Sequence, residues 1–124
     1  MRFDHIGIKS HDMEKSVDFY TRILGFQVLE KLDMVGRTFY FVGNDKTRIE
    51  IEEANPGDVQ MDSSTGYGLY HIALVVKDID ALAERLKAEG VTFIMEPIQL
   101  REDRKIAFIQ DPDGVPLQLI DFFE

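Results

Sequence analysis

The chain has 124 residues, of which 44% are hydrophobic and 30% charged, and this predicts one globular domain rather than a disordered chain. The absence of cysteine excludes disulfides, thiolate metal sites and a cysteine nucleophile. The formal net charge of -9, from 14 Lys and Arg against 23 Asp and Glu, disfavours nucleic acid and anionic membranes as partners. No apolar stretch approaches the roughly 18 residues of a membrane span, and no signal-like segment begins the chain. We therefore expect a cytoplasmic protein that acts on a small molecule.

The first half of the chain predicts a strand, a helix and three further strands. Alternating apolar residues over 2–9 are typical of a strand, and apolar residues at helical spacing follow Asp12, which is a good N-cap. Gly25 ends that helix. The strands expected after it cover residues 26–32, 38–42 and 48–52.

A segment rich in turn-forming residues, 54–66, links the first half to the second. The second half predicts the same order of elements. A strand over 67–76 precedes a helix that Asp78 caps and Gly90 ends. The remaining expected elements are a strand over 91–96 closed by Pro97, a polar loop over 98–103, and strands over 106–110 and 117–122.

The two halves are related by an internal repeat. Phe3–Lys9 matches Leu69–Val75, with a histidine followed by isoleucine at the same place in both segments. We therefore expect an α+β fold in a single domain over residues 1–124, made of two βαβββ modules over 1–53 and 67–124. The modules are expected to form a curved mixed sheet with the helices on its convex face.

Alternation along the strands assigns four polar side chains to the face of the sheet away from the helices. The repeat pairs His5 with His71, and Glu50 with Gln118. A single histidine in a strand is usually not a ligand, so the prediction depends on the whole set. Two imidazoles, one carboxylate and one amide oxygen suit a divalent metal such as Zn, Ni, Co, Mn or Fe.

Several segments together resemble the motifs of the vicinal oxygen chelate superfamily, the glyoxalase I/bleomycin-resistance fold. They are Phe3–Ile8, Ser16–Tyr20 with Leu24–Phe26, Arg48–Ile51, Tyr70–Val76 with Asp78–Ile79, and Phe108–Gly114 with Leu117–Leu119. The resemblance covers essentially the whole chain and implies metal ligands at His5, Glu50, His71 and Gln118. The superfamily contains glyoxalase I, methylmalonyl-CoA epimerase, extradiol dioxygenases, antibiotic-resistance proteins and metal-free binders, so the resemblance implies a fold more sharply than a reaction.

The chain departs from the glyoxalase I pattern at Gln118. Glyoxalase I-like members usually carry a glutamate at this place, which acts as both base and ligand. The Gln118 amide can coordinate through its oxygen but cannot accept a proton at neutral pH. Glu50 is then the only carboxylate among the four expected ligands.

Three functions stay open on the sequence alone. The first is a glyoxalase I-like or epimerase-like lyase or isomerase, in which Glu50 removes a proton α to a carbonyl of a small thiol adduct or thioester. The second is an Fe(II) extradiol dioxygenase with His5, His71 and Glu50 as its facial triad. The third is a non-catalytic resistance protein that binds a small molecule on aromatic side chains.

Three arginines are the expected substrate-binding residues, because an anionic tail such as a glutathione carboxylate or a CoA phosphate requires cations. They are Arg37, Arg101 and Arg104. Acidic residues interleave with the last two, so a solvated charged loop is the favoured interpretation there, and a substrate-binding role for Arg101 and Arg104 is the alternative. A two-fold homodimer is expected, with the four ligands drawn from one chain or from two.

Overall fold

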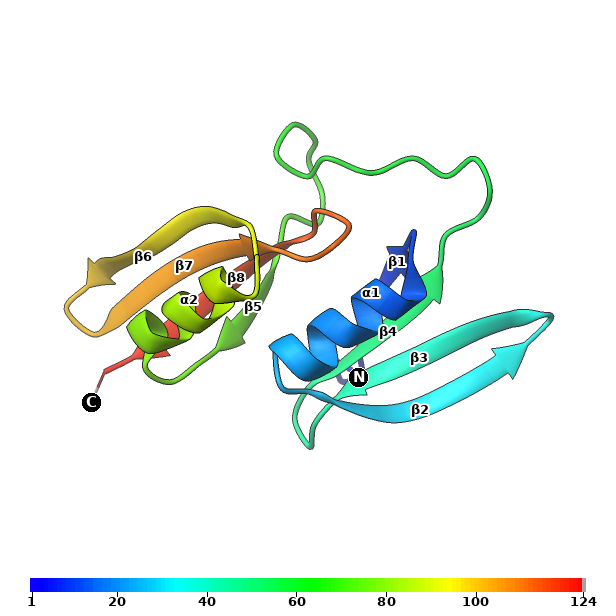
Figure 1. Cartoon of the computed structure of the whole chain (residues 1–124), viewed down its shortest axis with the longest axis horizontal. Helices are drawn as coiled ribbons and strands as arrows, with labels where there is room; N and C mark the ends of the chain where they lie inside the picture. Colours follow the sequence, from blue (N-terminus) through cyan, green and yellow to red (C-terminus); the bar gives the residue numbers. More distant parts are fainter. Residues whose placement is uncertain (124) are drawn as a thin grey trace. The chain divides into compact units, whose positions relative to one another are not determined.

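The computed structural model describes residues 1–123, and the chain divides into two compact units, module 1 (Met1–Val59) and module 2 (Gln60–Glu124). Each module contains one helical segment and four strands in the order βαβββ (Figure 1). This order confirms the predicted α+β fold and its repeat. Within residues 1–123, no helix has both the length and the apolar character needed to cross a membrane.

Module 1 forms a four-stranded mixed sheet in the order β1-β4-β3-β2. Strand β1 pairs with β4 in parallel because the chain crosses over through a helix between them, whereas the successive strands β2, β3 and β4 pair antiparallel. The elements are β1 (Ile6–Ser10), α1 (Met13–Asp18), the π-helical turn η1 (Phe19–Ile23), β2 (Gln27–Met34), β3 (Arg37–Gly43) and β4 (Arg48–Glu53).

Module 2 repeats this arrangement, with strand order β5-β8-β7-β6. Strand β5 is parallel to β8, and the remaining pairs are antiparallel. The elements are β5 (Ile72–Val75), α2 (Ile79–Ala88), β6 (Phe93–Arg101), β7 (Arg104–Gln110) and β8 (Pro116–Phe122). Corresponding strands therefore occupy corresponding places in the two sheets, as the sequence repeat predicts.

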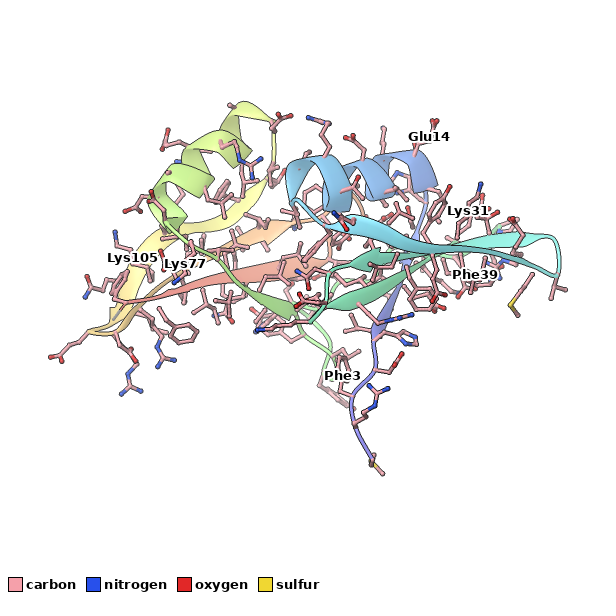
Figure 2. All side chains as sticks on the ribbon, turned by 90° about the horizontal axis from the view of Figure 1, so that it is seen from below. Phe3, Glu14, Lys31, Phe39, Lys77 and Lys105 are labelled. Carbon is pink, nitrogen blue, oxygen red and sulfur yellow. The ribbon has the colours of Figure 1, made fainter. Side chains whose placement is uncertain are left out.

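The core of module 1 lies between its helical segment and one face of its sheet. Helix α1 begins after Asp12, whose Oδ1 accepts a hydrogen bond from the backbone N–H of Lys15 at 3.2 Å. The core side chains are Phe19, Tyr20 and Ile23 from the turn η1, and Val42, Ile49 and Ile51 from the strands. Figure 2 shows Phe39 on the face of the sheet away from α1, which is the face that carries Glu50.

The core of module 2 is built in the same way under α2. The buried carboxylate of Asp121 in β8 accepts a hydrogen bond at 3.0 Å from the backbone N–H of Ile79, the first residue of α2. It thereby satisfies a donor that the helix itself leaves unpaired. The core side chains are Ile79, Ala83 and Leu86 from α2, and Ala107, Ile109, Leu117 and Leu119 from the strands.

The prediction for residues 91–103 was wrong in one respect. Pro97 does not close the strand, because β6 runs from Phe93 to Arg101 and takes up most of the expected polar loop. Pro97 is tolerated since β6 is the edge strand, and its register with β7 is shifted between Met95 and Ile98. The first strand of each module is also shorter than expected, so His5 and His71 each lie one residue before the strand.

Candidate metal and substrate site

Module 1 brings His5 and Glu50 to the same face of its sheet. Gly7 of β1 is in register with Glu50 of β4, which is in register with Phe41 of β3. His5 precedes Gly7 by two residues and meets the Phe41 ring edge-on, with ring centroids 5.1 Å apart. Phe41 is only 7% exposed, so its ring is a fixed apolar surface beside both polar side chains.

Gly7 leaves room for the Glu50 carboxylate. A Cβ atom at this position would lie 3.4 Å from Oε1 of Glu50, at the limit of van der Waals contact. Glu50 itself is half-buried, whereas the neighbouring Ile49 and Ile51 of β4 are buried on the helix side. The carboxylate therefore lies over the glycine and faces away from the core, as the alternation predicts.

The imidazole of His5 has a carboxylate partner. Its Nδ1 lies 2.7 Å from Oδ2 of Asp4. This hydrogen bond is the largest cause that holds the pKa of Asp4 below its ordinary value, and the nearby positive charge of Arg48 acts in the same direction. The guanidinium carbon of Arg48 lies 4.7 Å from the centroid of the Phe41 ring, and its Nη2 lies 3.6 Å from a Glu30 oxygen.

Module 2 presents the equivalent residues on the equivalent face. Ala73 of β5 and Phe108 of β7 are both in register with Gln118 of β8. The His71 ring meets the Phe108 ring edge-on at 5.1 Å between centroids, the same distance as in module 1, and contacts the Tyr70 ring at 4.6 Å. Nδ1 of His71 is buried and, among the residues that the structure describes, has no hydrogen-bond partner.

Each module thus contributes one imidazole and one oxygen donor from the predicted ligand set. Taken by itself, neither module gathers three or more His, Asp or Glu side chains in a metal-binding arrangement within residues 1–123. The pairs are His5 with Glu50 and His71 with Gln118, and each flanks a phenylalanine on one sheet face.

The three predicted substrate-binding arginines lie in different surroundings. Arg37 of β3 forms an ion pair with Glu52 at 3.1 Å and donates to the backbone carbonyl of Glu53. Arg104 begins β7, and its Nε donates to Asp103 at 2.9 Å while its guanidinium carbon lies 4.9 Å from the Phe122 ring centroid.

Arg104 shares a sheet face with one of the expected ligands. Its register partner in β8 is Phe122, four residues from Gln118, so the Arg104 side chain lies on the Gln118 face. Arg101 is exposed at the end of β6, directly opposite Arg104. The two arginines therefore lie on neighbouring strands at the end of a hairpin, not in the flexible loop that the sequence suggested.

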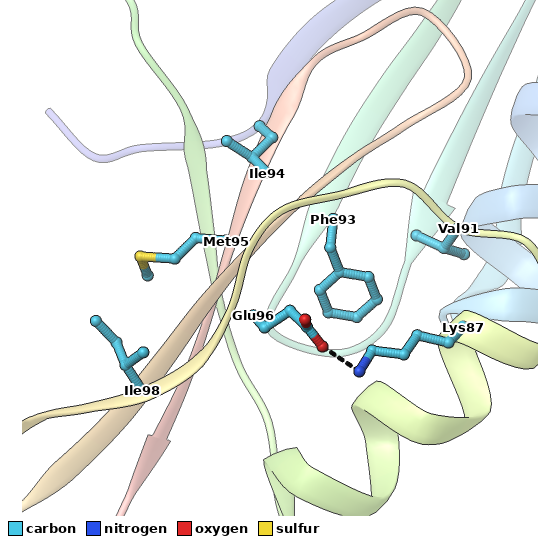
Figure 3. Close-up of a pocket in the computed structure, with 7 residues that line it drawn as sticks. All are labelled: Lys87, Val91, Phe93, Ile94, Met95, Glu96 and Ile98. Carbon is cyan, nitrogen blue, oxygen red and sulfur yellow. Dashed lines mark ion pairs between the residues drawn. The ribbon is translucent and has the colours of Figure 1, made fainter.

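A surface groove of module 2 lies apart from the residues discussed above. It has a volume of about 710 Å³ and runs between the end of α2 and the edge strand β6. Figure 3 shows an ion pair between Lys87 and Glu96 across it, next to the ring of Phe93. His71 directly precedes β5, and Gln118 lies in β8. Strand β7 separates both of these strands from the edge strand β6, so the groove is not part of the candidate site.

Comparison with known proteins assigns the family. The model of the glyoxalase/bleomycin resistance protein/dioxygenase superfamily matches residues 2–119. The chain belongs to this superfamily. The resemblance found in the sequence motifs is thereby confirmed.

Curated relatives of this superfamily member carry the name lactoylglutathione lyase. The protein from Neisseria meningitidis is 35% identical over 127 residues, which are 97% of this chain and 90% of the relative. The Arabidopsis thaliana protein is 30% identical over 125 residues, but the chain spans only 44% of its length. Among solved structures, the trypanothione-dependent glyoxalase I of Leishmania major matches with a TM-score of 0.81 and 28% identity, over 98% of this chain and 86% of that one. These relatives agree with the expectation of a glyoxalase-like enzyme.

The sequence analysis assigned no role to two side chains at the candidate site. Asp4 forms the hydrogen bond to His5, and Arg48 lies over Phe41 beside it. The aspartate directly before the histidine was a usable signal, because an adjacent carboxylate is within reach of an imidazole. The contact of Arg48 with Phe41 depends on the pairing of β3 with β4, which the local sequence does not show.

Proposed function

We propose that this chain is a glyoxalase I-like divalent-metal lyase or isomerase, which removes a proton α to a carbonyl of a small thiol adduct or thioester. The observation that carries the proposal is the repeated half-site, an imidazole and an oxygen donor flanking a phenylalanine in each module. Relatives named lactoylglutathione lyase support a hemithioacetal of glutathione as the substrate class. The match to the Neisseria meningitidis relative includes 90% of that protein's length.

The donor set fits a divalent metal of the class that the family resemblance implies. We propose His5, Glu50, His71 and Gln118 as its ligands, with Zn, Ni, Co, Mn and Fe as the candidate ions. When bound, the ion would supply positive charge that stabilises the negative charge developing on the substrate oxygen.

Glu50 is the proposed base. It is the only carboxylate in the proposed ligand set, and a strand with buried neighbours fixes its backbone. Gln118 occupies the equivalent place in module 2 but is neutral and accepts no proton, so it orients and coordinates only. A single residue would therefore have to take the proton from one carbon and return it to the next, within one bound substrate.

The arginines are proposed to hold the anionic part of the substrate. Arg104 is the favoured candidate, because it shares a sheet face with Gln118 and its guanidinium is held against Phe122. Arg101 is beside it across the hairpin. Arg37 is ion-paired with Glu52 and Arg104 with Asp103, so an incoming carboxylate would compete with an existing partner at either arginine.

The assembly proposed for this enzyme is a two-fold homodimer in the cytoplasm. Each module supplies two of the four ligands, and a symmetric pair of chains offers two complete sets. Light scattering together with metal titration tests this, since the proposal requires two ions for each dimer.

Replacement of the proposed base tests the mechanism. Glu50→Gln keeps an oxygen donor but removes the base, so we expect turnover of the methylglyoxal–glutathione hemithioacetal to fall by at least about 100-fold while metal remains bound. The control is Glu53→Gln on the same strand, whose side chain is exposed. Full activity in Glu50→Gln would refute the assignment, and ligand-induced stabilisation without turnover in the native protein would favour a binding protein instead.

A further inference from the structure

The two histidines proposed as ligands are held by different partners. In module 1, Nδ1 of His5 is hydrogen-bonded to Oδ2 of Asp4 at 2.7 Å. In module 2 the residue at the repeat position of Asp4 is Tyr70, which offers a ring face instead of a carboxylate. Nδ1 of His71 is buried without a hydrogen-bond partner in the described part of the chain. Both modules therefore contain the imidazole, but the residue beside it is Asp4 in module 1 and Tyr70 in module 2.

A carboxylate beside Nδ1 determines which ring nitrogen is free. A neutral imidazole carries one proton, and a hydrogen bond from Nδ1–H to an anionic oxygen keeps it on that nitrogen. The lone pair then stays on Nε2, which is the nitrogen able to bind a metal. The same hydrogen bond increases the electron density on the ring, which makes Nε2 a stronger donor.

Cationic side chains lie near the Asp4 carboxylate. Arg2 lies 3.7 Å from Oδ1, and the positive field of Arg48 also reaches Asp4. Arg48 is held in turn by the Phe41 ring and by Glu30. The position equivalent to Arg48 in module 2 is Pro116, so this second support is also confined to module 1.

We propose that Asp4 is a positioning residue that fixes His5 with its proton on Nδ1 and its lone pair on Nε2. The consequence is that His5 is the stronger imidazole donor of the two, while within residues 1–123 His71 is oriented by the rings of Tyr70 and Phe108 and by no hydrogen bond at Nδ1. This inference deepens the proposed function and rests on it where metal binding is concerned. The hydrogen bond itself is independent of any metal.

The first test measures the tautomer in metal-free protein. With ¹⁵N-labelled histidine at a pH well above the ordinary imidazole pKa of about 6.5, two-bond ¹H–¹⁵N correlation spectra distinguish Nδ1–H from Nε2–H. We expect His5 to show Nδ1–H in the native protein and to lose this preference in Asp4→Ala, with His71 unchanged. A His5 tautomer that is the same in both proteins would overturn the proposal.

The second test measures metal affinity by competition with a chromogenic chelator, with Zn²⁺ as the probe. We expect Asp4→Ala to weaken Zn²⁺ binding by about 10–100-fold, and Asp4→Asn, which keeps an acceptor oxygen without the charge, to weaken it less. Asp45→Ala is the matched control, because it removes one negative charge from an exposed turn. Circular dichroism verifies that each variant is folded.

The two tests separate the two proposals. Native protein that binds no Zn²⁺ refutes the metal-dependent function and the donor ranking, while the tautomer spectrum still decides whether Asp4 fixes His5. Native protein that binds Zn²⁺ as tightly as Asp4→Ala refutes the positioning role alone. A loss of affinity equal to that of Asp45→Ala has the same meaning, because it reduces the effect to net charge.

Discussion

The contact between Arg48 and Phe41 is predicted to stabilise module 1 in a measurable way. Phe41 is 7% exposed and contacts two partners, the guanidinium of Arg48 at 4.7 Å and the imidazole of His5 at 5.1 Å. Phe41→Leu removes both ring contacts while it keeps an apolar side chain in place. The matched change in module 2 is Phe108→Leu, at a half-buried ring that contacts His71 and, at 6.3 Å between centroids, Tyr70, but has no arginine at the repeat position.

The size of the effect follows from these contacts. An aromatic pair contributes about 0.5–1.5 kcal/mol, and a cation over a ring at a partly exposed site about 0.5–1 kcal/mol. The lower part of the second range applies, since about a third of the Arg48 side chain is exposed. The smaller apolar surface of leucine costs about 1 kcal/mol more. We therefore expect Phe41→Leu to lower the free energy of unfolding by about 2–3 kcal/mol, and Phe108→Leu by less.

A double-mutant cycle isolates the arginine contact. Arg48→Leu removes the charge and keeps an apolar side chain without adding a sulfur–aromatic contact, and the ion pair with Glu30 is lost in both backgrounds, so that contribution cancels in the cycle. The free energy of unfolding is measured by urea denaturation with far-UV circular dichroism, because the chain contains no tryptophan. We expect a coupling energy of about 0.5 kcal/mol. A coupling energy below about 0.3 kcal/mol, which is within the scatter of additive pairs, would refute the reasoning.

Two further predictions concern the stability of the fold. Asp121→Ala leaves the backbone N–H of Ile79 without its buried acceptor, and we expect a loss of about 1–2 kcal/mol in urea denaturation; an unchanged midpoint would show that water replaces the carboxylate. The fold also holds the pKa of several aspartates below the ordinary value, Asp58 mainly through the backbone N–H of Asn55 and Asp18 mainly through Arg22. Because these groups are more acidic in the folded state, their contribution is present above pH of about 4 and is lost as the pH falls through the folded pKa values. The melting temperature should therefore drop in acid, and Asp58→Asn should flatten that drop.

The sequence predicted the elements that depend on local patterns. The alternation in β4 and β8, the caps at Asp12 and Asp78, and the repeat itself are all readable from residue spacing. These signals are local because burial of every second side chain is required wherever one face of a sheet is covered. The pairing of each histidine with an oxygen donor on one face follows directly from them.

The features that the sequence did not predict depend on pairing between distant segments. Taken by itself, Pro97 predicts the end of a strand. Strand β6 continues through it because β6 is an edge strand whose register with β7 is shifted there. The contact of Arg48 with Phe41 likewise requires the pairing of β3 with β4. Arg104 appeared to belong to a solvated loop, yet its register with Phe122 assigns it to the Gln118 face.

The differences between the modules bear on how a duplicated scaffold can do acid–base chemistry. In both modules a histidine meets a phenylalanine ring edge-on, at the same distance of 5.1 Å between centroids. The ionisable groups are unequally distributed, because Glu50 corresponds to the neutral Gln118. Two identical carboxylates at one ion would compete for a single role, and each would lower the tendency of the other to ionise. In the proposed site, a carboxylate from one module and an amide from the other would remove this competition, so the proton would have one acceptor and the other oxygen donor would remain neutral.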